Sequence, residues 1–159
     1  MPYSNEGRTM TPHEYKMNQY APTYQQGVMT PPPALVGFED RPFEYVYNPP
    51  NGELTALQLI NPDAVAINTD ADFWMAAWYI SLYTGAFQIQ LTDSSGYQLS
   101  DGLINSAAIS NVASDPTVFS PAHPFPAGGK IQLVIQDLSD ATNPLQIVFK
   151  GWKRFRVQR

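Results

Sequence analysis

The sequence predicts an all-β protein, an antiparallel β-sandwich of jelly-roll-like form that follows a long extended N-terminal arm. From Phe38 onward, apolar and polar residues alternate with a period of two, which is the pattern of strands with one buried face. Turn residues (Pro, Gly, Asn, Asp) separate the alternating segments, and no window outside the first 37 residues shows a capped helical period. Roughly eight short strands without intervening helices are typical of a sandwich.

The first 37 residues have a different composition. They contain no Ile and no Phe, and they are rich in Pro, Gln, Asn, Thr and widely spaced Tyr and Met. Three consecutive prolines at residues 31–33 favour an extended backbone and forbid a helix there. Such a segment cannot bury a core of its own, so we expect an extended arm over residues 1–37 and one β-sandwich domain over residues 38–159. Its large side chains are candidate interface anchors: Tyr3, Tyr15, Tyr20, Tyr24 and Met29.

The strands are predicted from the alternation and from the turns that end each segment. A turn at residues 61–63 (Asn-Pro-Asp) separates the second strand from the third, and a hairpin turn at residues 93–96 precedes the sixth. Residues 105–128 contain four prolines and are predicted to be a loop. In chain order we expect strands at residues 42–48, 54–60, 64–68, 72–83, 86–92, 97–100, 131–136 and 145–150.

The long strand at residues 72–83 is apolar on both faces. Strict alternation puts Phe73, Met75, Ala77 and Tyr79 on one face and Trp74, Ala76, Trp78 and Ile80 on the other. An antiparallel strand of this kind is buried on both sides. We therefore expect one face in the core and the other in a subunit contact or under the arm, with Trp74 and Trp78 as candidate interface residues. A sugar-binding platform made of these aromatic rings is the alternative.

Charge is scarce and unevenly distributed. Charged residues make up 14% of the chain, against the ~25% usual for soluble domains, which predicts that much of the surface is covered by partners. Five of the nine basic residues lie in the last ten positions, and all 14 acidic residues precede them. This tail could bind nucleic acid, but the net charge of −5 favours a final strand whose cations pair with acids of its own or a neighbouring body. The tail contributes four more interface candidates: Trp152, Lys153, Arg154 and Arg156.

No residue pattern points to catalysis or to a metal. The chain has no cysteine, and neither His13 nor His123 has a companion histidine at ligand spacing. The acid pairs Asp70/Asp72 and Asp137/Asp140 are best explained as turn caps, and no Gly-x-Ser-x-Gly elbow is present. We expect no catalytic residue, no cofactor and no metal, and hence no enzyme. The start of the chain does not resemble a signal peptide and no stretch is apolar for 18 residues, so we expect a soluble protein made in the cytoplasm and bound to no membrane.

Residues 41–155 resemble the small structural proteins of tailed bacteriophages. The similarity lies in residues 126–139 (PAGGKIQLVIQDLS), residues 147–155 (IVFKGWKRF), the Phe-x-Tyr strand after Arg41-Pro42, and residues 70–74 (DADFW). The proteins that it resembles are of the capsid cement or decoration type, generally β-sandwiches. The resemblance implies a virion protein on the capsid surface that bridges capsid subunits, with the major capsid protein and copies of itself as partners and no catalytic residues. Alternatives are a neck, tail or fibre-base connector and a carbohydrate-binding β-sandwich module.

Overall fold

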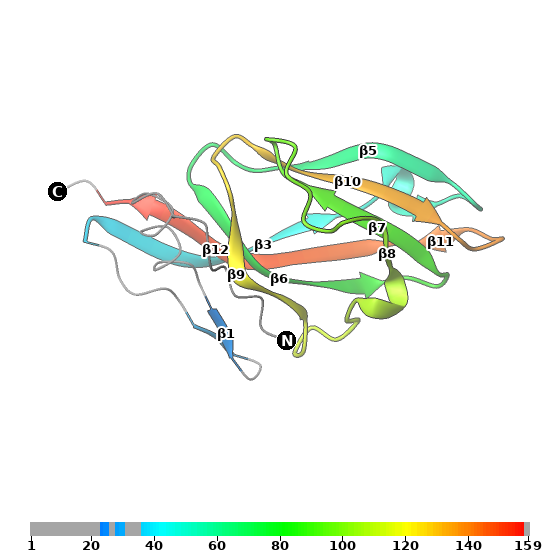
Figure 1. The fold of residues 1–159 in the computed structure, drawn as a ribbon, viewed down its shortest axis with the longest axis horizontal. Helices are drawn as coiled ribbons and strands as arrows, with labels where there is room; N and C mark the ends of the chain where they lie inside the picture. Colours follow the sequence, from blue (N-terminus) through cyan, green and yellow to red (C-terminus); the bar gives the residue numbers. More distant parts are fainter. Residues whose placement is uncertain (1–22, 26–27, 31–35, 158–159) are drawn as a thin grey trace, which may run out of the picture.

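The computed structural model describes residues 23–25, 28–30 and 36–157, which form two stacked four-stranded antiparallel sheets and two separate two-stranded ones (Figure 1). One sheet has the strand order β5-β10-β7-β8 and the other has the order β3-β12-β6-β9. The long strands are β3 (Phe38–Tyr47), β5 (Leu59–Ala66), β6 (Asp72–Leu82), β7 (Phe87–Thr92), β9 (Thr117–Phe125), β10 (Lys130–Asp137) and β12 (Gln146–Arg156). The short elements are β1 (Thr23–Gln25), β2 (Val28–Thr30), β4 (Glu53–Leu54), β8 (Ile104–Asn105), β11 (Asn143–Pro144) and the 3₁₀ turns η1 (Pro50–Gly52) and η2 (Ser106–Ala108).

The core lies between the two sheets, and the prediction of an antiparallel β-sandwich is confirmed. In β7 and β10 the buried residues alternate with partly exposed ones, as the period of two predicts. The largest fully buried apolar side chains come from both sheets and from β4: Leu54, Phe73, Met75, Ile80, Phe87, Ile89, Phe125, Ile131, Leu133, Ile135 and Phe149.

Proline lies inside two strands, at positions where the sequence predicted a turn and a loop. Residues 61–63 were expected to form a turn, but β5 continues through them, and its register against β10 shifts between Leu133 and Ile135. Asn61 and Pro62 therefore form a bulge opposite a single residue. Residues 105–128, expected to be a loop, contain β9 with Pro121 and Pro124 inside it. Both strands lie at sheet edges, where a residue without an N–H group interrupts no central ladder.

The segment after the hairpin turn at residues 93–96 also differs from the prediction. The turn itself is present, with the Gly96 N–H donating to the Asp93 carbonyl. Residues 97–100 form only an isolated bridge between Thr92 and Gln98, and β8 pairs with β7 in place of the expected strand.

The last strand, β12, runs through the centre of its sheet between β3 and β6 as far as Arg156. The basic tail is therefore a strand, as the favoured interpretation required. Its partner β3 begins at Phe38, which pairs with Arg156, so this strand starts four residues earlier than predicted.

A bulge in β6 changes which side chains face the core. Trp74 pairs with Trp152 and Ala77 with Lys150, and the register shifts between these pairs, so that Ala76 has no partner on β12. Beyond the bulge the alternation is inverted, and Trp78 joins Phe73 in the core. The predicted face assignment, which placed Trp78 beside Trp74, is wrong because strict alternation does not allow for a bulge.

Candidate interaction surfaces

Two tryptophans lie side by side on the outer face of the β3-β12-β6-β9 sheet. Trp74 and Trp152 are cross-strand partners, and with Ala76 and Ala122 they form the surface named here the tryptophan face. The Arg154 guanidinium lies over the Trp74 ring, 5.2 Å from its centroid. Although they point away from the core, Trp74 is only 5% exposed and Trp152 only 8%. The third candidate, Trp78, stacks on Phe149 inside the sandwich and takes no part in this surface.

The indole nitrogens of the tryptophan face have no hydrogen-bond partner among the described residues. Both Trp74 Nε1 and Trp152 Nε1 are buried, and no described acceptor reaches either. Buried indole N–H groups usually find an acceptor, because leaving one without a partner is costly. This surface is therefore incomplete in terms of hydrogen bonding.

The β1-β2 hairpin lies over this outer face. Cα atoms of β1 come within 8 Å of both β9 and β6. If β1 only extended the sheet beyond β9, it would lie two strand spacings, about 10 Å, from β6. Because β1 comes closer to β6 than that, it crosses the face of the sheet. In Figure 1, β1 is on the side of this sheet that faces away from β5 and β10. Of the candidates in the arm, Tyr24 and Met29 pair across the hairpin, and Tyr3, Tyr15 and Tyr20 lie outside the described residues.

Lys153 and Arg154 of β12 pair with acids of the same chain, as the favoured interpretation of the tail expected. Lys153 Nζ lies 2.8 Å from Asp70 Oδ1 and 4.1 Å from the centroid of the Phe43 ring. Arg154 donates two hydrogen bonds of 2.8 Å to Asp40, its cross-strand partner.

Lys153 differs from the rest of the tail because it points into the sandwich and is only 2% exposed. Burial acts to lower its pKa, but the hydrogen bond with Asp70 and the neighbouring Tyr45 outweigh that effect and raise the pKa above its ordinary value. Lys153 is therefore charged at neutral pH and serves to hold β12 against the end of the core. Arg156, by contrast, is exposed at the end of the strand.

Replacing Lys153 with glutamine is expected to lower the free energy of unfolding by about 2 kcal/mol, since the buried amide loses the ion pair and the aromatic contacts. Arg156→Gln is the matched control, a change of the same type at an exposed position of the same strand, and should have little effect. Urea denaturation of both variants measures the difference. Equal stability of the two variants would mean that Lys153 does not support the fold.

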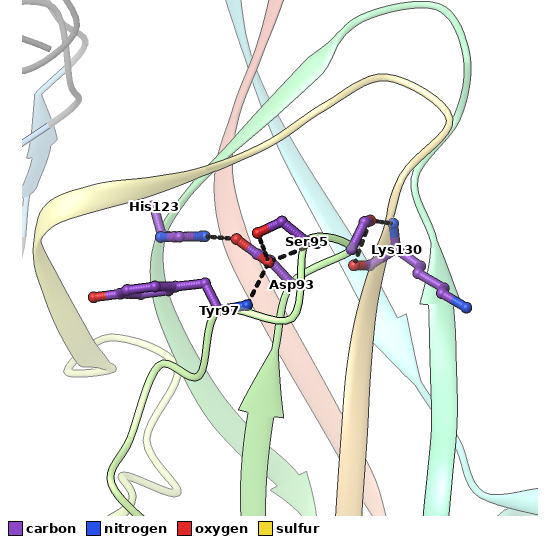
Figure 2. A network of polar contacts seen from close by, with 6 residues as sticks. Asp93, Ser95, Tyr97, His123 and Lys130 are labelled. Atoms are coloured by element: carbon purple, nitrogen blue, oxygen red, sulfur yellow. Dashed lines mark hydrogen bonds and ion pairs between the residues drawn. The ribbon is translucent and has the colours of Figure 1, made fainter.

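A polar cluster joins the turn after β7 to β9 of the other sheet (Figure 2). Asp93 Oδ1 accepts hydrogen bonds from the N–H groups of Ser95 and Tyr97, and Asp93 Oδ2 lies 3.0 Å from His123 Nε2. The Tyr97 ring stacks on His123 with a centroid distance of 5.5 Å. Although burial acts to raise the Asp93 pKa, the hydrogen bond from the Ser95 hydroxyl, together with those from the two N–H groups and His123, holds it below its usual value. The cluster fastens the two sheets together. No group of three His, Cys, Asp or Glu side chains in the described part of the chain is placed to hold a metal ion.

Exposed apolar side chains gather at the opposite end of the sandwich, where three loops meet. The main-chain N–H of Leu57 donates to the Ser139 carbonyl, and that of Leu138 donates to the Ala86 carbonyl. We name the exposed side chains of this end the apolar tip: Leu57, Leu59, Tyr83 and Leu138.

Leu57 at the apolar tip has a strained backbone. Its φ is +58°, in the left-handed region that residues other than Gly, Asn and Asp rarely adopt, and its side chain is 65% exposed. Asp137 Oδ2 accepts from its N–H at 3.0 Å, and Gln136 Nε2 donates to its carbonyl at 3.1 Å. Sequence reasoning missed this residue. Asp137 was the signal that could have led to Leu57. It was recognised as a turn cap, and its carboxylate accepts a hydrogen bond that fixes the strained loop.

No protein-family model, no curated protein and no solved structure matches this chain. Among the described residues, no helix has the length and apolar character needed to span a membrane.

Proposed function

We propose that this chain is a structural protein of a virus particle, of the capsid cement or decoration type, that binds the shell through the apolar tip and bridges capsid subunits. The partners in this proposal are the major capsid protein and further copies of the chain. The resemblance of residues 41–155 to phage structural proteins supports the virion setting, and the low charge content supports extensive covered surface.

The observation that carries the proposal is the strained, exposed Leu57. A left-handed backbone costs roughly 1–3 kcal/mol, and here it holds an apolar side chain in the solvent instead of in the core. Backbone strain persists only where the surroundings enforce it, and it is concentrated at functional positions. A rigid apolar side chain at the end of a domain is the kind of anchor that protein interfaces bury at their centre.

The carbohydrate-binding alternative receives no support from the described residues. A sugar platform needs an exposed aromatic face, whereas the rings of Trp74, Trp78 and Trp152 are all buried. The cavity beside Trp78, between β8 and β9, measures about 110 Å³ and is lined mostly by apolar side chains such as Leu91 and Phe119. Sugar recognition depends on placed polar groups in addition to rings. A neck, tail or fibre-base position differs from the shell only in symmetry, so counting copies of the chain per purified particle by mass spectrometry distinguishes the two.

Leu57→Gly tests the proposal, because it removes the anchor and relieves the strain. We expect the variant to be more stable than the parent by about 1 kcal/mol, and to bind less well to particles that lack the protein. Cosedimentation with such particles measures attachment, and thermal unfolding measures stability. A gain in stability combined with a loss of attachment separates a binding role from a folding role.

Val157→Ser is the matched control, since Val157 is an exposed apolar residue at the other end of β12. It should leave attachment unchanged. If Leu57→Gly also leaves attachment unchanged, or if the chain is absent from purified particles, the proposed function is wrong.

A further inference from the structure

We propose that the cavity between β8 and β9 is a binding site for a small apolar molecule, about the size of one six-membered ring. This cavity, named here the edge cavity, measures about 110 Å³ and shares no residue with the apolar tip. Buried side chains form its floor, and exposed or partly exposed ones form its mouth: Trp78, Leu91 and Ile109, and Leu99, Ala108 and Phe119, respectively. The proposal does not depend on the virion setting.

The edge cavity exists because both strands at this edge of the sandwich are irregular. On one side, β8 has only two residues, so it covers little of the sheet edge. On the other side, residues 119–122 of β9 leave the ladder with β6, opposite Ala76 alone. Bulges of this kind are common beside functional sites. Phe119 begins this bulge, and its ring lies 6.2 Å from that of Trp78, measured between centroids.

The lining of the edge cavity has little to offer a polar ligand. None of its described residues is charged, and its hydroxyl groups already form hydrogen bonds within the chain. Thr117 Oγ1 accepts from the Ser110 N–H at 2.8 Å, and Ser100 Oγ donates to the Gly102 carbonyl at 2.7 Å. A bound water needs about two to four polar partners. Water in this cavity is therefore held weakly, and its displacement by an apolar group is favourable.

The volume of the edge cavity sets the size of the ligand. An engineered cavity of about 150 Å³ lined by Leu, Ile and Phe binds benzene, so a cavity of about 110 Å³ with an open mouth accepts one ring or a short alkyl chain. The side chain of a protein partner would bring its polar main chain to a mouth whose hydroxyl groups are already engaged. A free molecule carries no such main chain and is therefore the occupant that we propose.

The walls of the edge cavity are fixed without a ligand. The Leu99 N–H donates to the Leu91 carbonyl at 2.9 Å, and Gln90 Nε2 donates to the Ser100 carbonyl at 3.1 Å. On the opposite side, the hydrogen bond to Thr117 holds the segment that precedes β9. Ligand binding therefore requires little ordering of the protein, as is usual for preformed pockets.

Benzene is the probe that tests the proposal on the full chain. We expect it to shift the methyl NMR signals of Leu99, Ile104 and Ile109 in a saturable manner. At a concentration roughly tenfold above its Kd, it should raise Tm by roughly 5 °C, because it binds only the folded state. Nuclear Overhauser effects from bound benzene to the methyl groups of Leu91 and Ile109 should locate it at the floor of the cavity.

Two neighbouring alanines of η2 provide a matched pair of variants. Ala108→Leu places a larger side chain at the mouth and should weaken benzene binding by about tenfold or more. Ala107→Leu is the control, because Ala107 is also exposed but lies outside the cavity lining, and it should keep the parental affinity. Thermal unfolding without benzene verifies that both variants are folded.

Absence of saturable shifts in the parent would overturn the proposal. Equal affinities of the two alanine variants would also overturn it, because benzene would then bind elsewhere. If Ala108→Leu does not fold, the Overhauser effects in the parent decide: contacts with Leu91 and Ile109 support the proposal, and contacts only with other methyl groups overturn it. Leu57→Gly should leave benzene binding unchanged, so failure of this proposal and failure of the proposed function can be told apart.

Discussion

Replacing Gly151 with alanine is expected to lower the free energy of unfolding by about 3 kcal/mol or more, one of the two largest effects predicted for this chain. Gly151 lies opposite the bulge of β6, in the middle of the sheet. A Cβ atom at this position would overlap the main-chain carbonyl oxygen of Trp74 and lie 3.0 Å from the Phe73 ring. The overlap is with backbone, which cannot rotate away as a side chain can, so the bulge itself would have to move.

Thermal unfolding of Gly151→Ala measures this effect, with an expected decrease in Tm of about 10 °C or more. Gly102→Ala is the matched control, because a Cβ atom there meets nothing within 4 Å and its φ is not in the left-handed region. The control should unfold close to the parent temperature. A Gly151→Ala variant as stable as the control would mean that the bulge does not depend on close approach of the two strands.

The fold was predictable because alternation is local, whereas bulges are not. The strands β7, β10 and β12 were found from their period of two, and the core residues of β7 and β10 follow from it. The bulge at Ala76 depends on Gly151, which lies on a strand 75 positions later in the sequence. No property of residues 72–83 alone therefore indicates that Trp78 faces the core.

Edge strands with proline were missed for a related reason. A proline cluster predicts a loop when each residue is judged by its own propensity. In β9 the position of the strand at the sheet edge removes most of the penalty, and only the assembled sheet shows which strands are edges.

The candidate surfaces also differ in how far the sequence could predict them. The tail cations and the tryptophans were identified from their types and positions, and the structure adds which of them share a surface. The apolar tip was not identified, because leucine is a common residue. Its left-handed backbone at position 57 is imposed by two hydrogen bonds: the Asp137 carboxylate accepts from its N–H, and the Gln136 amide donates to its carbonyl.

Replacing Asp137 with alanine is the second change with a large expected effect, again a loss of about 3 kcal/mol or more. The side chain is completely buried and accepts hydrogen bonds from the N–H groups of Leu57 and Ser139, the Ser139 hydroxyl and the Asn143 amide. Asn143 in turn accepts from the N–H groups of Thr84 and Gly85. Removal of the carboxylate leaves several donors without an acceptor in the interior and releases all three loops of the apolar tip.

The pH dependence of stability gives this prediction a distinctive signature. Burial acts to raise the Asp137 pKa, but the hydrogen bonds from Asn143, Ser139 and Leu57 outweigh it and hold the pKa below its ordinary value. A carboxyl group whose pKa is lower in the folded state than its unfolded value of about 3.9 contributes stability at higher pH, and this contribution is lost as the pH falls through the folded-state pKa. The parent should therefore lose stability in acid, and Asp137→Ala should lose less between neutral and acidic pH.

Asp140→Ala provides the comparison, because Asp140 is an exposed acid in the same connection between β10 and β11. Urea denaturation at neutral and acidic pH should show near-parental stability and a parental pH slope for this control. If the two alanine variants have the same stability at neutral pH, the Asp137 carboxylate does not hold the tip together. In that case the left-handed backbone of Leu57 must be maintained by its main-chain hydrogen bond to Ser139 and by the Gln136 side chain. The cooperative loss of three loops on removal of one carboxylate is thus the result that would identify Asp137 as the residue that organises the apolar tip.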